Sequence, residues 1–146
     1  MTFRVGALLT AAAVVWMAGV SGRAGVAAQA QKSVWDGVYT EEQAKRGEEA
    51  FTKECSSCHG NDLAGDGFAP SLAGPEFASA WDGLSVGDLL ERIRVSMPPT
   101  DPGIVPVPGK VDIIAFLLKS NKFPAGKEEL AKEPEALKQI AYKAHQ

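Results

Sequence analysis

The stretch Cys55-Ser56-Ser57-Cys58-His59 decides the interpretation of this chain. It has the pattern C-x-x-C-H, which is the attachment signature of a c-type haem. Two thiols at this spacing lie on one side of a short helical turn, where each can add to one haem vinyl group. The histidine that follows the second thiol then places its ring under the iron. We therefore predict one covalent haem on Cys55 and Cys58, with His59 as an iron ligand.

Other roles for the two cysteines have little support in the rest of the sequence. A thioredoxin-like C-x-x-C would be expected in a βαβ setting, and no such setting is visible. A structural zinc site normally takes four protein ligands, whereas the only other histidine, His145, lies almost at the C-terminus. A disulfide between Cys55 and Cys58 would close only a very short loop.

The N-terminus has the features of a secretory signal peptide. Arg4 is followed by an apolar run over residues 5–20, and a stretch of small residues ends in Ala28-Gln29-Ala30. Cleavage after this A-x-A-like site would make Gln31 the first residue of the mature chain. We predict a signal peptide over residues 1–30 and a periplasmic location. The apolar run is shorter than the roughly 20 residues of a spanning helix, but an uncleaved, membrane-anchored form is kept as an alternative.

Residues 31–146 are enough for one small domain. Cleavage removes two of the 15 basic residues and none of the 18 acidic ones, which changes the net charge from −3 to −5. An acidic chain without a basic run gives no reason to expect nucleic acid or an anionic membrane surface as a partner. A domain of this size buries limited apolar surface, so we expect the haem to form part of the core.

Four helical segments are predicted and no strand pattern stands out, so the predicted fold class is all-α. The first helix follows a T-x-x-Q capping box that starts at Thr40. The second covers about residues 85–96, and the third covers about residues 110–119, which are apolar on most sides. A fourth, weaker helix follows Pro134, with three residues on one side: Leu137, Ile140 and Ala141.

Met97 is the best candidate for the second axial ligand of the iron. The other two methionines leave with the signal peptide, and His145 lies where chain ends are usually mobile. Pro98 and Pro99 bar helix continuation and bias Met97 towards extended geometry. Three alternatives are kept: Met97 as a core filler, ligation by His145, and an open site.

Four stretches together resemble a class I monohaem cytochrome c, in particular the small bacterial domains found alone or with quinoprotein dehydrogenases. The resemblance covers about residues 38–124, with a short lead at 31–37 and a tail at 125–146. It implies a small cytochrome c-type helical domain wrapped around one covalently bound haem c. The stretches are Cys55–His59, Ala69-Pro70-Ser71-Leu72, Arg94-Val-Ser-Met97-Pro98-Pro99 and Ile113-Ile-Ala-Phe116-Leu-Leu118.

The resemblance also implies roles for single residues around the haem. The carbonyl of Pro70 would accept a hydrogen bond from Nδ1–H of His59, which leaves Nε2 for iron. Leu72 would pack on the haem ring, and Trp81 would lie near the propionates. Arg94 could pair with a propionate, although a position on the solvated face of a helix would account for an arginine there about as well.

In this family the N-terminal and C-terminal helices cross closely, and here they correspond to the first and third predicted helices. Gly47, Phe51 and Phe116 resemble the residues at that crossing. The chain departs from the family at Val105-Pro-Val-Pro-Gly109, where relatives carry a polar, capped helix start. We therefore expect the third helix to start late and to lack a side-chain N-cap.

The resemblance and the ligand set imply an electron carrier and not an enzyme. With both axial positions filled, the haem would exchange electrons and bind no substrate. We expect a monomer that takes electrons from a periplasmic dehydrogenase and passes them towards a terminal oxidase or another cytochrome. Little charge lies between Met97 and Gly109, so docking there is expected to be mostly apolar and transient. Two alternatives are an accessory haem subunit of a complex and a ligand-binding or catalytic cytochrome.

Overall fold

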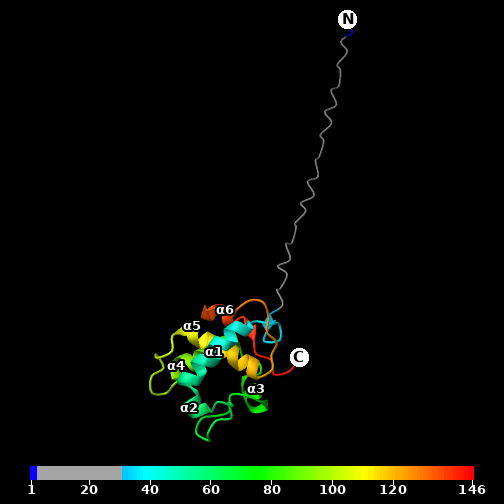
Figure 1. Cartoon of the computed structure of the whole chain (residues 1–146). Helices are drawn as coiled ribbons and strands as arrows, with labels where there is room; N and C mark the ends of the chain where they lie inside the picture. Colours follow the sequence, from blue (N-terminus) through cyan, green and yellow to red (C-terminus); the bar gives the residue numbers. More distant parts are fainter. Residues whose placement is uncertain (3–30) are drawn as a thin grey trace.

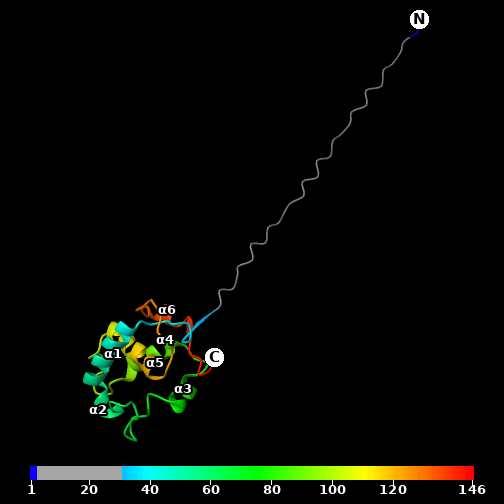
Figure 2. The ribbon, with the colours of Figure 1, turned by 45° about the vertical axis from the view of Figure 1, so that its right-hand side comes forward.

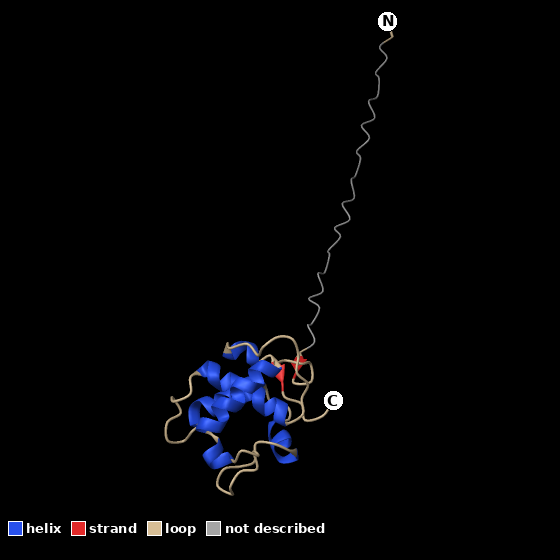
Figure 3. Ribbon diagram, viewed as in Figure 1, coloured by secondary structure: helices blue, strands red, loops and turns tan. Residues whose placement is uncertain are grey.

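The computed structural model describes residues 1–2 and 31–146, so the predicted signal peptide lies outside the described residues except for Met1 and Thr2. Helices dominate the domain, and two short strands pair beside them (Figures 1 and 3), so the predicted all-α fold class is confirmed. The elements in chain order are β1 (Lys32–Ser33), α1 (Glu41–Glu54), α2 (Ser56–His59), α3 (Pro75–Trp81), α4 (Val86–Ser96), α5 (Val107–Ser120), α6 (Pro134–Leu137) and β2 (Ile140–Ala141).

Helix α1 starts where the sequence predicts, but its capping box is used differently. The hydroxyl of Thr40 accepts a hydrogen bond from the backbone N–H of Gln43 at 3.1 Å. The side-chain amide of Gln43 instead exchanges two hydrogen bonds with the backbone of Leu130, at 2.8 and 3.3 Å. Gln43 therefore ties the C-terminal tail to α1, because a buried amide needs partners for both its donor and its acceptor.

Helices α1 and α5 cross in close contact (Figure 1), and Gly47 of α1 lies against the backbone of α5. A Cβ atom on Gly47 would lie 1.8 Å from the carbonyl oxygen of Asp112, so only glycine allows the two backbones to approach this closely. One helical turn further along α1, the ring centroids of Phe51 and Phe116 are 5.3 Å apart. The predicted crossing is thus confirmed, and it fixes the direction in which α1 leads into the C-x-x-C-H stretch.

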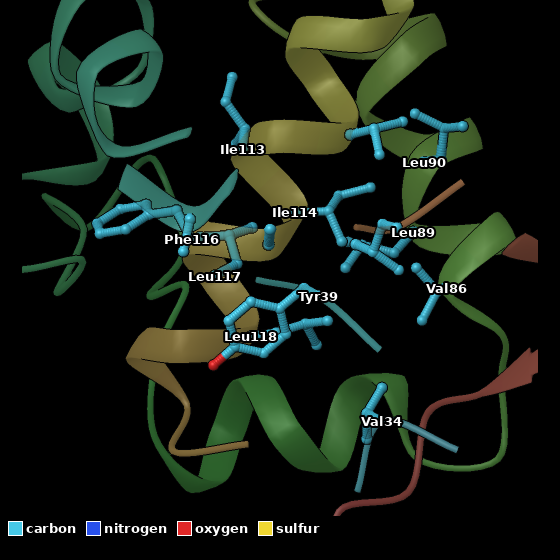
Figure 4. Close-up of a cluster of buried hydrophobic side chains, with 14 of the residues drawn as sticks. Val34, Tyr39, Val86, Leu89, Leu90, Ile113, Ile114, Phe116, Leu117 and Leu118 are labelled. Carbon is cyan, nitrogen blue, oxygen red and sulfur yellow. The ribbon is translucent and has the colours of Figure 1, made fainter. Parts of the chain in front are cut away.

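Helix α4 packs on α5 through an aliphatic layer. Its start is fixed by a complete capping box between Ser85 and Asp88, as the spacing of these residues predicts. Leu89 is almost fully buried, and Figure 4 shows Ile114 of α5 pointing towards it. Full burial of such a side chain stabilises the fold by about 1.5–3 kcal/mol, compared with about 1 kcal/mol for a cap. Burial of this layer therefore stabilises the fold more than the cap does, and the cap sets where α4 begins.

Helix α5 begins at Val107, three residues before the predicted start at 110, so the predicted late start is wrong. Pro106 precedes it and Pro108 lies in its first turn. The first N–H groups of a helix have no partner within the helix, so proline is tolerated there. The predicted absence of a side-chain N-cap is confirmed.

The C-terminal tail differs from the predicted amphipathic helix. Helix α6 ends at Leu137, and the next residues, Ile140–Ala141, form β2, which pairs in parallel with β1. The prediction that Ile140 and Ala141 share a helix with Leu137 is therefore wrong. The pairing joins Lys32 to Ile140, and such a long-range contact leaves no signal in a local sequence window.

Helix α3 is an element that the sequence did not predict. It begins with Pro75 after Gly74, whose φ of 89° is in the left-handed region, and its one buried residue is Phe77. A single buried position gives no periodic stripe, which explains why it was missed. None of the described helices is long and apolar enough to cross a membrane.

Candidate functional site

The two cysteines lie at the junction of α1 and α2. The backbone N–H of Cys55 bonds to the carbonyl of Phe51 at 2.8 Å and so ends α1, while the N–H of His59 bonds to the carbonyl of Cys55 at 3.1 Å. Cys55 is half-buried, Cys58 is exposed, and both are free thiols. This turn brings both thiols and the imidazole into one short segment, as the motif requires for haem attachment.

The environment of Cys55 argues against a thioredoxin-like role. Burial, with a smaller effect of the Glu54 carboxylate, raises the pKa of the Cys55 thiol to about 11. Redox-active cysteines in C-x-x-C motifs instead have a lowered pKa, because the thiolate is the attacking group. Residues 31–146 contain no group of three or more His, Cys, Asp and Glu side chains that could hold a metal ion.

The imidazole of His59 is buried and held in one tautomer. Its Nδ1 atom lies 2.9 Å from the carbonyl oxygen of Pro70. A carbonyl can only accept, so Nδ1 carries the proton and donates it. Within residues 31–146 no hydrogen bond engages Nε2. The ring therefore has one nitrogen fixed by the protein and one lone pair available to a metal.

The loop of residues 60–69, which we call the α2–α3 loop, positions the Pro70 carbonyl. The N–H of Gly65 bonds to the carbonyl of His59 at 2.9 Å, and the N–H of Leu72 bonds to the carbonyl of Leu63 at 2.8 Å. Gly65 has a φ of 77°, and a Cβ atom there would lie 2.3 Å from the oxygen of Ala69. Glycine is needed at this point for the loop to return to His59.

Met97 occupies the position that immediately follows α4. It is half-buried and extended, with φ −129° and ψ 134°, and its N–H bonds to the carbonyl of Ile93 at 3.0 Å. Extended geometry at this residue agrees with the prediction from Pro98 and Pro99. His145, the alternative ligand, is exposed near the C-terminus.

Several apolar side chains that pack against the core are only partly buried. Leu72 follows Pro70, Trp81 ends α3 with its ring 6.2 Å from that of Phe77, and Ile93 lies on α4. Each packs against the core and is also partly open to solvent. A thiol pair, an imidazole with a free Nε2 and partly uncovered apolar side chains fit a haem, which would cover such surfaces.

Arg94 is engaged elsewhere in this structure. Its guanidinium forms two hydrogen bonds of 2.8 Å with the carboxylate of Glu91, one turn earlier on α4. Both side chains are about half exposed, so the pair lies on a solvated helix face. The propionate role of Arg94 stays a prediction, and it would compete with this ion pair.

Two further residues support the site, and the sequence analysis missed them. Lys110 of α5 is only 2% exposed, and its Nζ donates a hydrogen bond to the carbonyl of Pro102, in the segment after Met97. The side-chain amide of Asn121, at the end of α5, donates to the carbonyl of Leu72 at 3.0 Å. The one available signal for Lys110 was a lysine at the start of a helix that is apolar on most sides, while Asn121 had none.

Comparison with known families agrees with this geometry. Residues 42–117, more than half of the chain, match the family described as cytochrome C oxidase, cbb3-type, subunit III. The chain belongs to this family. It is a cytochrome c-type domain, which implies covalently bound haem c and electron transfer through the haem. The matched range includes the C-x-x-C-H stretch and Met97. The comparisons with curated proteins and with solved structures give no match.

Proposed function

We propose that this protein is a periplasmic electron carrier with one haem c, attached through Cys55 and Cys58 and ligated by His59 and Met97. The observation that carries the proposal is the hydrogen bond from Nδ1 of His59 to Pro70, which leaves Nε2 as the free donor atom. Met97 is the only methionine after residue 30, and its backbone is extended just after α4. Its thioether is therefore the one proposed as the second iron ligand.

The bound haem supplies a one-electron redox centre. His59 and Met97 would hold the iron between them, which would leave no vacant site for small ligands such as oxygen. A thioether in place of a second imidazole raises the reduction potential. These properties suit a carrier that receives electrons from a periplasmic dehydrogenase and delivers them to a terminal oxidase or another cytochrome.

The proposed location and assembly follow from the sequence. The predicted signal peptide over residues 1–30 would export the chain, and the remaining domain would carry a net charge of −5. A small acidic domain of this kind is expected to be a monomer that forms short-lived complexes. Such encounters between redox proteins use small interfaces.

The ligand assignment is tested with Met97→Ala in the holoprotein. We expect loss of the weak far-red sulfur-to-iron band, carbon monoxide binding in the reduced form, and a fall in potential on the order of 0.1 V, within the ~0.8 V that axial ligands span. His145→Ala is the control and should leave all three properties unchanged. An unaltered spectrum and potential in Met97→Ala would show that another group binds the iron.

A second candidate is a haem subunit of a membrane oxidase complex. The matched family is described as an oxidase subunit, which favours this possibility. The two candidates differ in the isolated protein. A mature chain that starts at Gln31 and elutes as a monomer supports the carrier, whereas a retained N-terminus and a stable complex support the subunit.

A further inference from the structure

Phe68 is the most exposed large apolar side chain in residues 31–146, at 101% of its reference area. It lies in the α2–α3 loop, which forms the end of the molecule opposite α6 in both views (Figures 1 and 2). Single exposed apolar residues are common and need no explanation by themselves. Three properties of the surrounding loop set Phe68 apart.

The loop holds the backbone of Phe68 in a fixed position. One carboxylate oxygen of Asp66 accepts hydrogen bonds from the backbone N–H groups of Phe68 and Ala69, at 2.9 and 2.8 Å. These bonds lower the pKa of Asp66, chiefly the bond from Ala69, so its carboxylate is ionised at neutral pH. A fixed backbone removes part of the entropy cost of binding, and a phenyl side chain has only two rotatable angles left to order, so Phe68 can serve as an anchor for a partner.

The loop is joined to the predicted iron ligand at two points. The N–H of Gly65 bonds to the carbonyl of His59, and the carbonyl of Pro70 accepts from Nδ1 of the same residue. Phe68 lies between these two contacts in the chain. A partner bound to Phe68 would therefore dock beside the segment that bears the haem, where electron transfer needs it.

The charged residues of the α2–α3 loop itself are all acidic. Residues 54–91 contain no lysine or arginine, and two of their acidic residues, Asp62 and Asp66, lie exposed in the loop itself. A basic surface on a partner would be attracted to this end of the domain, which favours rapid association.

We infer that Phe68 is the anchor of a docking site for a redox protein that presents an apolar pocket surrounded by lysine and arginine side chains. The phenyl ring would fill the pocket, and Asp62 and Asp66 would face the basic rim. This inference rests on the proposed electron-transfer function. It places the centre of docking on the α2–α3 loop, in contrast to the mostly apolar surface expected between Met97 and Gly109.

The test measures electron exchange between the holoprotein and respiratory membranes of the organism that makes it. Phe68→Ala should lower the second-order rate about tenfold, as truncation of an interface anchor does. Leu84→Ala removes another exposed apolar side chain, between α3 and α4, and should change the rate less than about twofold. Oxidation by hexacyanoferrate(III), which needs no apolar anchor, should be the same in the wild type and both variants.

The charge contribution is tested with the double variant Asp62→Asn, Asp66→Asn. Asparagine keeps the side-chain oxygen that caps the loop, so only the charge is removed. The rate with membranes should fall several-fold at low ionic strength and depend less on salt. The control is Glu128→Gln, Glu133→Gln, an equal change of charge on exposed residues of the tail.

The outcomes separate this inference from the function on which it rests. A wild-type holoprotein that membranes neither oxidise nor reduce would contradict the proposed function and with it the docking site. A reactive wild type with Phe68→Ala equal to Leu84→Ala would overturn the docking site alone. A rate that rises with ionic strength would overturn the acidic complementarity.

Discussion

Lys110 places a buried cation next to the predicted haem site. Its ammonium donates to the carbonyl of Pro102, and it affects the pKa of the Cys55 thiol. Burial, followed by repulsion from Arg94, lowers the pKa of Lys110 itself. This charge should therefore have a measurable effect on the reduction potential of the haem iron.

We expect Lys110→Met to lower the reduction potential of the holoprotein. A nearby positive charge favours the reduced state, which carries one positive charge fewer than the oxidised state. For two unit charges about 10 Å apart at an effective dielectric constant of about 20, the interaction would be on the order of 1–2 kcal/mol, or tens of millivolts. Potentiometric titration measures the change.

Lys119→Met is the matched control, because the same substitution on α5 removes an exposed lysine that pairs with Glu41. Its potential should stay within a few millivolts of the wild type, since exposed charges are screened. Equal potentials in Lys110→Met and Lys119→Met would contradict an electrostatic role for Lys110.

At this scale the sequence reveals groups whose role is encoded locally. The C-x-x-C-H stretch and Met97 before two prolines could be identified from a few neighbouring residues. Lys110 and Asn121 could not, because their roles depend on carbonyl groups of Pro102 and Leu72 that only the folded chain brings near. The tertiary contact, and not the residue type, makes them part of the site.

At the scale of helices, the crossing of α1 and α5 depends on the missing side chain of Gly47. We expect Gly47→Ala to destabilise the holoprotein by about 1–3 kcal/mol, the usual range for overpacking. The new Cβ would meet the backbone of Asp112 and not a mobile side chain, so the helices must separate. This penalty exceeds the gain of up to about 1 kcal/mol in helix propensity. Denaturant unfolding followed by circular dichroism measures the loss.

Gly109→Ala provides the matched control in the first turn of α5. There the new Cβ would lie 3.0 Å from a side-chain methyl of Val105, a contact that requires a shift of only a few tenths of an ångström and no movement of backbone. We expect unchanged or slightly higher stability. If the two alanine variants were equally stable, the close crossing at Gly47 would not be a source of stability.

The elements that could be predicted are those with short-range signals. Ser85 and Asp88 specify the start of α4 within four residues, and the apolar residues of α5 specify a buried helix. The pairing of β1 with β2 joins residues more than a hundred positions apart, so no local pattern contains it. The predicted fourth helix is longer than the observed α6 for the same reason, because Ile140 pairs with Lys32 of β1 and not with a helical neighbour.

At the scale of the whole molecule, the two ends of the described domain close on one another. The indole N–H of Trp35 donates to the carbonyl of Lys143 at 2.9 Å, and its ring meets Phe123 edge-on with centroids 4.8 Å apart. Phe123 in turn contacts Tyr142, with centroids 5.2 Å apart. The predicted lead at 31–37 and tail at 125–146 thus pack on the helices as parts of one core.

Tyr142 is fully buried in this cluster, so we expect Tyr142→Ala to lower the free energy of unfolding by about 3–5 kcal/mol, as for other large aromatic residues. Its hydroxyl has no hydrogen-bond partner among the described residues. Tyr142→Phe should therefore be neutral or stabilising by about 1 kcal/mol, because a buried unpaired polar group is unfavourable.

The buried hydroxyl of Tyr39, unlike that of Tyr142, has a partner, because it donates to the carbonyl of Phe123 at 2.7 Å. Tyr39→Phe should therefore destabilise by about 1 kcal/mol. Thermal and denaturant unfolding of the three holoproteins should each show a single transition. Wild-type stability in Tyr142→Ala would mean that the tail only covers the domain, whereas the expected loss means that the tail completes the core.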